Sequence, residues 1–114
     1  MRVLIIEDEP LLAGQLKKMI GEIEPSVETV AIAHTIAESV RLLRQPPQPE
    51  LILMDIELAD GQSFDIFQQV QIDSSVIFIT AYDEYAIKAF RLNGIDYLLK
   101  PVNKEELKTA LNKF

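Results

Sequence analysis

Short, continuous apolar runs alternate along the chain with segments in which apolar residues recur every three or four positions. Runs of the first kind, bounded by polar residues, are typical of strands that are buried on both faces of a parallel sheet. Three runs have this character, namely Val3–Ile6, Leu51–Met54 and Val76–Ile79. Two more mixed runs, Val27–Ala33 and Ile95–Leu99, carry charged or hydroxyl residues, and we predict that they form the edge strands.

The segments between the runs have the signatures of amphipathic helices. Pro10 to Glu24 has apolar residues at helical steps and a proline in its first turn, where the missing N–H costs nothing. Thr35 and Glu38 match a capping box at the start of a second helix, and Asn103 and Glu106 match one at the start of the last. Two further helices are predicted, over 63–71 and 83–92.

Five strand–helix units in succession predict an α/β fold with a five-stranded parallel sheet and helices on both faces. With the first, third and fourth strands buried and the other two at the edges, the strand order becomes 2-1-3-4-5, which is the flavodoxin-like three-layer sandwich. The chain shows no internal repeat and no linker, so residues 1–114 are expected to form one domain.

Composition narrows the classes of function. Acidic residues outnumber basic residues by 18 to 11, a formal charge of −7, which argues against contact of this domain with nucleic acid through phosphates. The chain has no cysteine and one histidine, so thiol catalysis, disulfides and multi-histidine metal sites are excluded. No apolar run is long enough to cross a membrane and no signal peptide is recognisable, so we expect a cytoplasmic protein without a membrane partner.

Polar residues stand directly at the ends of the apolar runs. Glu7 and Asp8 follow the first strand, Asp55 the third, Thr80 the fourth and Lys100 the fifth. Because ligands of open parallel sheets bind outside the carboxyl ends of the strands, these side chains should meet in one cleft.

The chemistry of that set points to a metal and a phosphoryl group. Carboxylates held close together recruit a cation, and oxygen ligands alone suit Mg²⁺ or, as an alternative, Mn²⁺. A lysine and a hydroxyl suit the oxygens of a phosphoryl group. No base is placed to activate a hydroxyl nucleophile, so the available nucleophile is a carboxylate itself.

The sequence resembles the receiver domain of two-component response regulators, with a CheY-like fold, over its whole length. The motifs that carry the resemblance are LIIEDEP, LILMDIEL and FITAYDEYAIKAFRLNGIDYLLKP, and the last is similar to receivers of the LytTR class, the LytR/AlgR type. The resemblance implies that Asp55 accepts a phosphoryl group from a sensor histidine kinase. It also implies that Asp8, Asp55 and the backbone carbonyl of Glu57 ligate Mg²⁺, with Glu7 holding the metal through water.

The same resemblance assigns the remaining site residues. Lys100 would pair with phosphoryl oxygens, next to a Lys100–Pro101 bond that is usually cis in receivers. Thr80 and the backbone N–H of Ala81 would bind the other oxygens, and Tyr97 stands at the position of the switch aromatic. Phosphorylation would then change the face formed by the fourth helix, fifth strand and fifth helix, a face that also suggests a homodimer.

Such a domain is not expected to be a turnover enzyme, because it only accepts and loses its own phosphoryl group. Receivers of the LytTR class usually precede a DNA-binding domain, so we expect this chain to be one domain of a longer transcription regulator. Two other classes remain open. One is a pseudo-receiver that binds partners without phosphorylation. The other is a small phosphatase, with Glu57 as acid and base, or a flavin carrier on the same fold.

Overall fold

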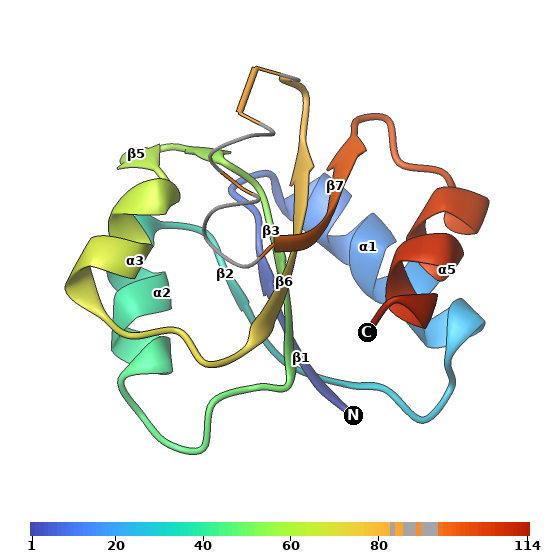
Figure 1. Ribbon diagram of the computed structural model, residues 1–114, viewed down its shortest axis with the longest axis horizontal. Coiled ribbons are helices and arrows are strands. Elements are labelled where there is room, and N and C mark those ends of the chain that lie inside the picture. Colours follow the sequence, from blue (N-terminus) through green and yellow to red (C-terminus); the bar gives the residue numbers. More distant parts are fainter. Residues whose placement is uncertain (83, 86–88, 90–93) are drawn as a thin grey trace.

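The computed structural model describes residues 1–82, 84–85, 89 and 94–114, and its centre is a five-stranded parallel sheet (Figure 1). The strand order β2-β1-β3-β6-β7 confirms the predicted order of five strands. The strands are β1 (Arg2–Ile6), β2 (Glu28–Ala33), β3 (Leu51–Met54), β6 (Ser75–Thr80) and β7 (Gly94–Leu99).

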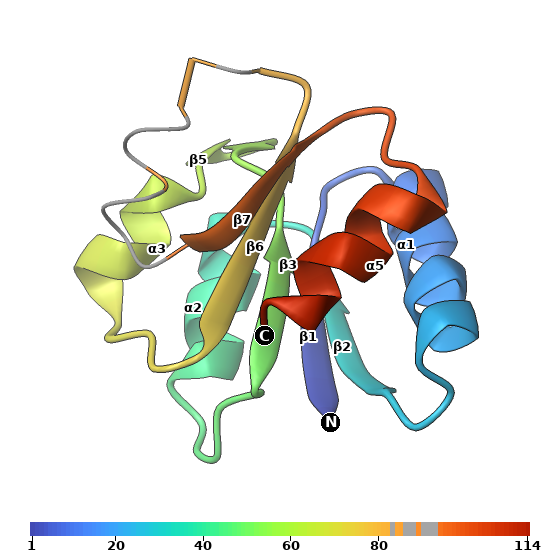
Figure 2. The same ribbon diagram turned by 45° about the vertical axis from the view of Figure 1, so that its right-hand side comes forward.

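Helices cover both faces of this sheet, as Figures 1 and 2 show. On one face lie α1 (Pro10–Ile23) and α5 (Lys104–Asn112), and on the other lie α2 (Ile36–Leu43) and α3 (Phe64–Gln69). The predicted helix over 83–92 lies for the most part outside the described residues. The three-layer α/β sandwich is therefore confirmed, with each helix within about two residues of its predicted bounds where the structure describes it.

The two faces of the sheet have cores of different composition. Against α1 and α5 the core contains no aromatic ring among the residues that the structure describes, and it is built from side chains such as Ile5, Ile20 and Leu107. Against α2 and α3 the core also contains aromatic rings, and those of Phe64 and Phe78 lie 5.8 Å apart. β1, β3 and β6 contribute buried residues to both cores, which is why their sequences are continuously apolar.

A short antiparallel hairpin that the sequence pattern did not predict follows β3. It pairs β4 (Glu57–Leu58) with β5 (Gly61–Gln62). Gly61 has φ 137°, and a Cβ built there would lie 3.1 Å from Ile36 Cδ1, so glycine suits both the backbone and the space. The turn residue Asp60 accepts hydrogen bonds from Ile36 N at 2.9 and 3.1 Å, which anchors the hairpin to the start of α2.

The two predicted helix caps are present. Thr35 Oγ1 accepts a hydrogen bond from Glu38 N at 3.1 Å, and Asn103 Oδ1 accepts one from Glu106 N at 2.8 Å. In a regular capping box the Glu38 carboxylate would accept from the backbone N–H of Thr35. Here it accepts from the N–H of the preceding residue, His34, at 2.9 Å.

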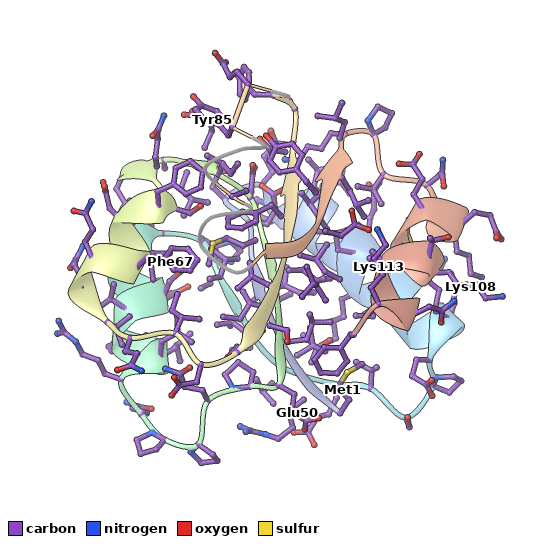
Figure 3. All side chains as sticks on the ribbon, in the orientation of Figure 1. Met1, Glu50, Phe67, Tyr85, Lys108 and Lys113 are labelled. Atoms are coloured by element: carbon purple, nitrogen blue, oxygen red, sulfur yellow. The ribbon has the colours of Figure 1, made fainter. Side chains whose placement is uncertain are left out.

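At the amino-terminal end of the strands one side chain, Gln48, joins two loops, the one between α2 and β3 and the one between α3 and β6. Gln48 Nε2 donates to the carbonyls of Leu43 and Gln71 at 3.1 and 2.8 Å. Gln48 Oε1 accepts from Asp73 N at 2.8 Å and from Ser74 Oγ at 3.4 Å. The amide thereby uses both donors and both acceptor positions. In Figure 3 the label Glu50 marks this amino-terminal end of the sheet, and the label Tyr85 marks the opposite, carboxyl-terminal end.

Candidate functional site

The carboxyl ends of β1, β3 and β7 bring Glu7, Asp55 and Lys100 into direct contact. Lys100 Nζ lies 2.7 Å from Glu7 Oε1 and 2.8 Å from Asp55 Oδ2. The two acids are buried, with exposed fractions of 1% and 6%, while the lysine remains partly open to solvent. Lys100 therefore bridges two carboxylates whose charges would otherwise repel each other. The Lys100–Pro101 peptide bond is cis, as the resemblance implied.

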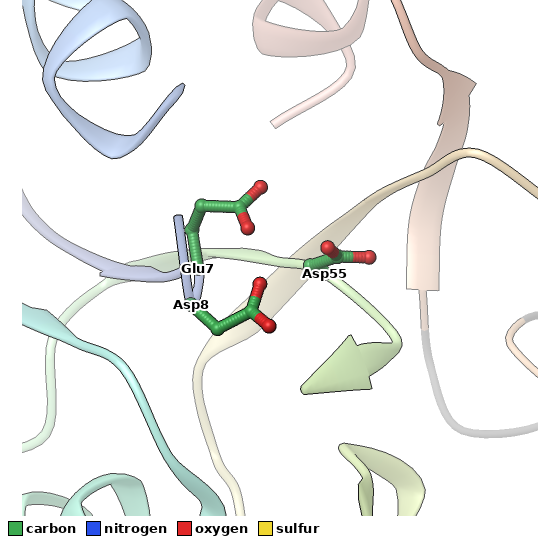
Figure 4. Close-up of side chains that lie close together, drawn as sticks. All are labelled: Glu7, Asp8 and Asp55. Carbon is green, nitrogen blue, oxygen red and sulfur yellow. The ribbon is translucent and has the colours of Figure 1, made fainter. Parts of the chain in front are cut away.

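Asp8 completes a group of three acids at this point. Glu7, Asp8 and Asp55 each offer a carboxylate oxygen, and these atoms lie within 4.8 Å of one another (Figure 4). In Figure 4 the side chains of Glu7 and Asp8 extend toward Asp55. A donor set of oxygen atoms alone fits Mg²⁺ or Mn²⁺, and the partly open Asp8 leaves access for ligands from solvent.

The electrostatics of the cluster follow from burial and crowding. The pKa of the Glu7 carboxyl is raised to about 7, chiefly by burial; the hydrogen bond from Lys100 opposes this rise, and Asp8 and Asp55 add to it. Burial alone would lower the pKa of Lys100, but hydrogen bonds to Asp55 and Glu7 and the charges of these acids raise it above its ordinary value. Lys100 is therefore a cation at neutral pH, beside a carboxyl that readily changes its charge.

Thr80, the last residue of β6, contributes a buried hydroxyl to the same end of the sheet. Its Oγ1 has no hydrogen-bond partner among the residues that the structure describes. Its backbone carbonyl accepts from Lys100 N at 2.8 Å, which ties the ends of β6 and β7 together. A buried hydroxyl without a partner costs free energy, and this one could donate to an acceptor oxygen of a ligand bound at the end of β6. Ala81 follows and is exposed.

Hydrogen bonds of the Ile56 backbone position the residues that follow Asp55. Asp55 Oδ1 accepts a hydrogen bond from Ile56 N at 2.7 Å, and the Ile56 carbonyl accepts one from Ser63 N, also at 2.7 Å. Successive carbonyls of a strand point to opposite edges, so the Glu57 carbonyl points away from β5. This orientation is compatible with the metal-ligand role predicted for the Glu57 backbone.

Tyr97, the predicted switch aromatic, lies half-buried on β7. Its ring centroid lies 6.5 Å from that of Phe78, and its hydroxyl donates to the backbone carbonyl of Tyr82. Tyr97 therefore contacts the chain two residues beyond Thr80.

The sequence pattern missed a three-membered hydrogen-bond network beside the site. Tyr85 Oη donates to Glu57 Oε1 at 2.7 Å, and Gln62 Nε2 lies 3.2 Å from Glu57 Oε1 and 3.0 Å from Tyr85 Oη. The hydrogen bond to Glu57, helped by burial, raises the pKa of Tyr85 to about 12. Tyr85 falls in the helix predicted over 83–92, and the apolar spacing that predicts this helix carries no signal for a polar partner.

Comparison with protein families identifies the family of the chain that carries this site. Residues 3–112 match the model of the response regulator receiver domain, and the chain belongs to that family. It is a receiver domain of a two-component response regulator, similar to those of LytT and LytR proteins. The predicted family is thereby confirmed.

Two curated relatives illustrate the similarity. The sensory transduction protein LytT of Enterococcus faecalis is 36% identical over 99% of this chain and 47% of its own length. The transcriptional regulatory protein LytR of Staphylococcus aureus is 34% identical over 99% of this chain and 46% of its own length. The chain thus spans about half the length of the curated relatives it matches.

Solved structures agree with the fold. The response regulatory domain of protein mrkE from Klebsiella pneumoniae matches with a TM-score of 0.87 at 28% identity, covering 99% of this chain and 93% of that one. The response regulator PhyR from Brucella abortus matches with a TM-score of 0.81 at 33% identity, over 98% of this chain and 46% of that one. Within the described part of the chain, no helix is both long enough and apolar enough to cross a membrane.

Proposed function

We propose that this domain is a phosphoryl-accepting switch in which Asp55 receives a phosphoryl group from a sensor histidine kinase. The observation that carries the proposal is the contact of one lysine with two buried acids, with Lys100 Nζ 2.8 Å from Asp55 Oδ2. This arrangement places the positive charge of a lysine next to the buried carboxylate that we propose as the nucleophile.

In the transfer, a carboxylate oxygen of Asp55 attacks the phosphorus atom of a phosphohistidine. The new P–O bond forms as the P–N bond breaks, and the electron pair of that bond stays on the imidazole nitrogen, which becomes neutral or takes a proton from solvent. The Lys100 ammonium, the Thr80 hydroxyl and the Ala81 N–H are proposed to bind the phosphoryl oxygens. These three donors would stabilise the charge that is spread over those oxygens.

The acid cluster is proposed to hold Mg²⁺, with Mn²⁺ as an alternative, through Asp8, Asp55 and the Glu57 carbonyl, and through water on Glu7. The fit rests on the oxygen donors of three acids within 4.8 Å. When bound, the metal would offset the negative charge that the carboxylates and the phosphoryl group bring together.

The proposed switch begins at Thr80. A phosphoryl group adds about −1.5 to −2 charges and strong acceptor oxygens beside a hydroxyl that has no partner in the described chain. Closure of Thr80 on that group would shift the chain that follows it and release Tyr97 from Tyr82. A nearly complete change of state requires about 5 kcal/mol of differential stabilisation, which several charge-assisted bonds of about 1.5–3 kcal/mol each would supply.

The partners follow from this reading. The surface altered by phosphorylation would lie around β7 and α5, and we propose that it mediates contact with a second copy of the chain. Because the LytT and LytR relatives are about twice as long, we propose that an output domain of the LytTR type binds DNA on behalf of the whole protein. The domain itself is proposed not to turn over a substrate.

Intact-mass spectrometry after incubation with acetyl phosphate tests the proposed function. We expect the mass of one phosphoryl group on the wild-type chain when Mg²⁺ is present and none when the metal is removed by a chelator. Asp55→Asn should show no adduct in either condition while keeping the wild-type circular dichroism spectrum, because asparagine has nearly the same shape and its amide oxygen can still accept from Ile56 N. Adduct formation by Asp55→Asn at the wild-type rate would rule out Asp55 as the acceptor.

A further inference from the structure

Glu57, the residue at the start of the hairpin that follows Asp55, has its carboxylate held by two side chains. Tyr85 Oη donates to it at 2.7 Å and Gln62 Nε2 at 3.2 Å, and these two donors lie 3.0 Å from each other. Each of the three groups thus contacts the other two. Figure 3 shows Tyr85 at the carboxyl-terminal end of the sheet, beside the end of β6.

The hairpin that carries Glu57 is itself anchored. Asp60 accepts from Ile36 N at 2.9 Å and from Ala37 N at 3.4 Å, at the start of α2, and Ser63 N donates to the Ile56 carbonyl at 2.7 Å. Glu57 therefore lies on a hairpin that is anchored to α2. The hydrogen bond from Tyr85 to Glu57 in turn attaches Tyr85 to this hairpin.

Tyr85 lies on the part of the chain that the proposed switch must move. It stands five residues beyond Thr80, and its ring packs at 5.7 Å from Phe64 and 6.1 Å from Tyr82. Tyr82 is held by a second phenol, since its backbone carbonyl accepts from the Tyr97 hydroxyl. Tyr82 and Tyr85 are therefore both held by hydrogen bonds. The Thr80 hydroxyl, in contrast, has no partner in the described chain.

We propose that the hydrogen bond from Tyr85 to Glu57 is a latch that holds the chain after Thr80 in the unphosphorylated conformation and opens when Thr80 closes on a phosphoryl group. The latch rests on the proposed function and adds to it a residue that sets the balance between the two states. A bond made in only one state favours that state by its net free energy. Loss of the Tyr85 hydroxyl should therefore ease the transition.

The ring of Tyr85 and its hydroxyl have separable roles. The ring fills space between Phe64 and Tyr82, and phenylalanine would fill the same space. Within the part of the chain that the structure describes, the hydroxyl bonds to Glu57 and Gln62. Tyr85→Phe therefore removes the latch and leaves the packing, and Tyr82→Phe is the matched control, because it removes a phenol hydroxyl from an exposed side chain of the same segment.

The test is isothermal titration calorimetry with beryllofluoride, a stable phosphoryl mimic, in the presence of Mg²⁺. We expect wild type to bind and Tyr85→Phe to bind about fivefold more tightly, as loss of one hydrogen bond to a carboxylate in the resting state implies. Tyr82→Phe should bind within about twofold of wild type. Gln62→Leu, which removes the hydrogen bond from the hairpin to Tyr85 Oη, is a further variant that should shift affinity in the same direction as Tyr85→Phe.

Each outcome decides between the two claims. Unchanged or weaker binding by Tyr85→Phe and Gln62→Leu, with normal binding by wild type, would overturn the latch and leave the proposed function standing. No binding by wild type would overturn both. In a Glu57→Ala background the effect of Tyr85→Phe should disappear, because the acceptor is gone. A persisting fivefold effect there would show that the hydroxyl does not act through Glu57.

Discussion

The two ends of the parallel sheet differ in whether their polar side chains have hydrogen-bond partners. At the amino-terminal end, both donors and both acceptor positions of the Gln48 amide have partners, and the side chain so joins two loops. At the carboxyl-terminal end, the Thr80 hydroxyl is buried and without a partner in the described chain, and three acids lie within 4.8 Å of one another.

The difference separates groups that stabilise the fold from groups that serve a ligand. Satisfied hydrogen bonds order the loops at the amino-terminal end and contribute to the free energy of unfolding. Buried, unpaired or crowded polar groups lower it, and a protein retains them where function requires them. We therefore expect substitutions at the two ends to have opposite consequences for stability and for phosphoryl chemistry.

The largest effect is expected for Asp8→Asn in the presence of Mg²⁺. At a metal concentration one hundred times Kd, binding should raise the free energy of unfolding of wild type by about 2.7 kcal/mol, and the variant should lose most of this gain. Without metal the variant should be at least as stable as wild type, because one of three crowded negative charges is gone. Urea denaturation with and without Mg²⁺ measures both quantities.

The matched control for that substitution is Asp73→Asn, which makes the same chemical change at the opposite end of the sheet. Its backbone N–H to Gln48 Oε1 is retained, so its response to Mg²⁺ should equal that of wild type. Equal stabilisation of Asp8→Asn and wild type by the metal would contradict the proposed metal site.

A somewhat smaller effect is expected for Gln48→Leu, at the amino-terminal end. The variant keeps the side-chain volume but removes every hydrogen bond of the amide, including that to the carbonyl of the buried Leu43. We expect a loss of about 2 kcal/mol in the free energy of unfolding and no change in the rate of phosphoryl acceptance from acetyl phosphate. A variant as stable as wild type would contradict the structural role of Gln48. A slower reaction with acetyl phosphate would contradict its independence from the site at the opposite end of the sheet.

The smallest change in stability is expected for Thr80→Val, which replaces the unpaired hydroxyl by a methyl group of similar size. The free energy of unfolding should stay the same or rise by up to about 1 kcal/mol, because no hydrogen bond of the described chain is lost. Affinity for beryllofluoride with Mg²⁺ should fall about tenfold, measured by calorimetry. A destabilised variant with full affinity would assign Thr80 to the fold and not to the ligand.

Much of this arrangement could be predicted from the sequence. The apolar runs that became β1, β3 and β6 identify strands buried on both faces, and their positions require a sheet that brings Glu7, Asp55 and Thr80 to one edge. The caps at Thr35 and Asn103 were also recognisable, because their bonds join residues that are close in sequence.

Contacts between distant residues were not predictable in the same way. The β4–β5 hairpin consists of two-residue strands, too short to show any periodicity, and its Asp60 caps a helix that begins 24 residues earlier. Lys100 pairs with Glu7 as well as with Asp55, whereas the resemblance had linked Glu7 only to the metal. The bond from Tyr85 to Glu57 spans 28 residues and depends on where the hairpin is anchored.

The central claim, that Asp55 accepts the phosphoryl group, is tested most directly by locating that group on the chain. After treatment with acetyl phosphate and Mg²⁺, reduction with borohydride converts an aspartyl phosphate to homoserine, and peptide mass spectrometry identifies its position. The account predicts homoserine at position 55 and at no other position. Homoserine at position 8, or a stable phosphate ester on Thr80 in place of any reducible group, would contradict it.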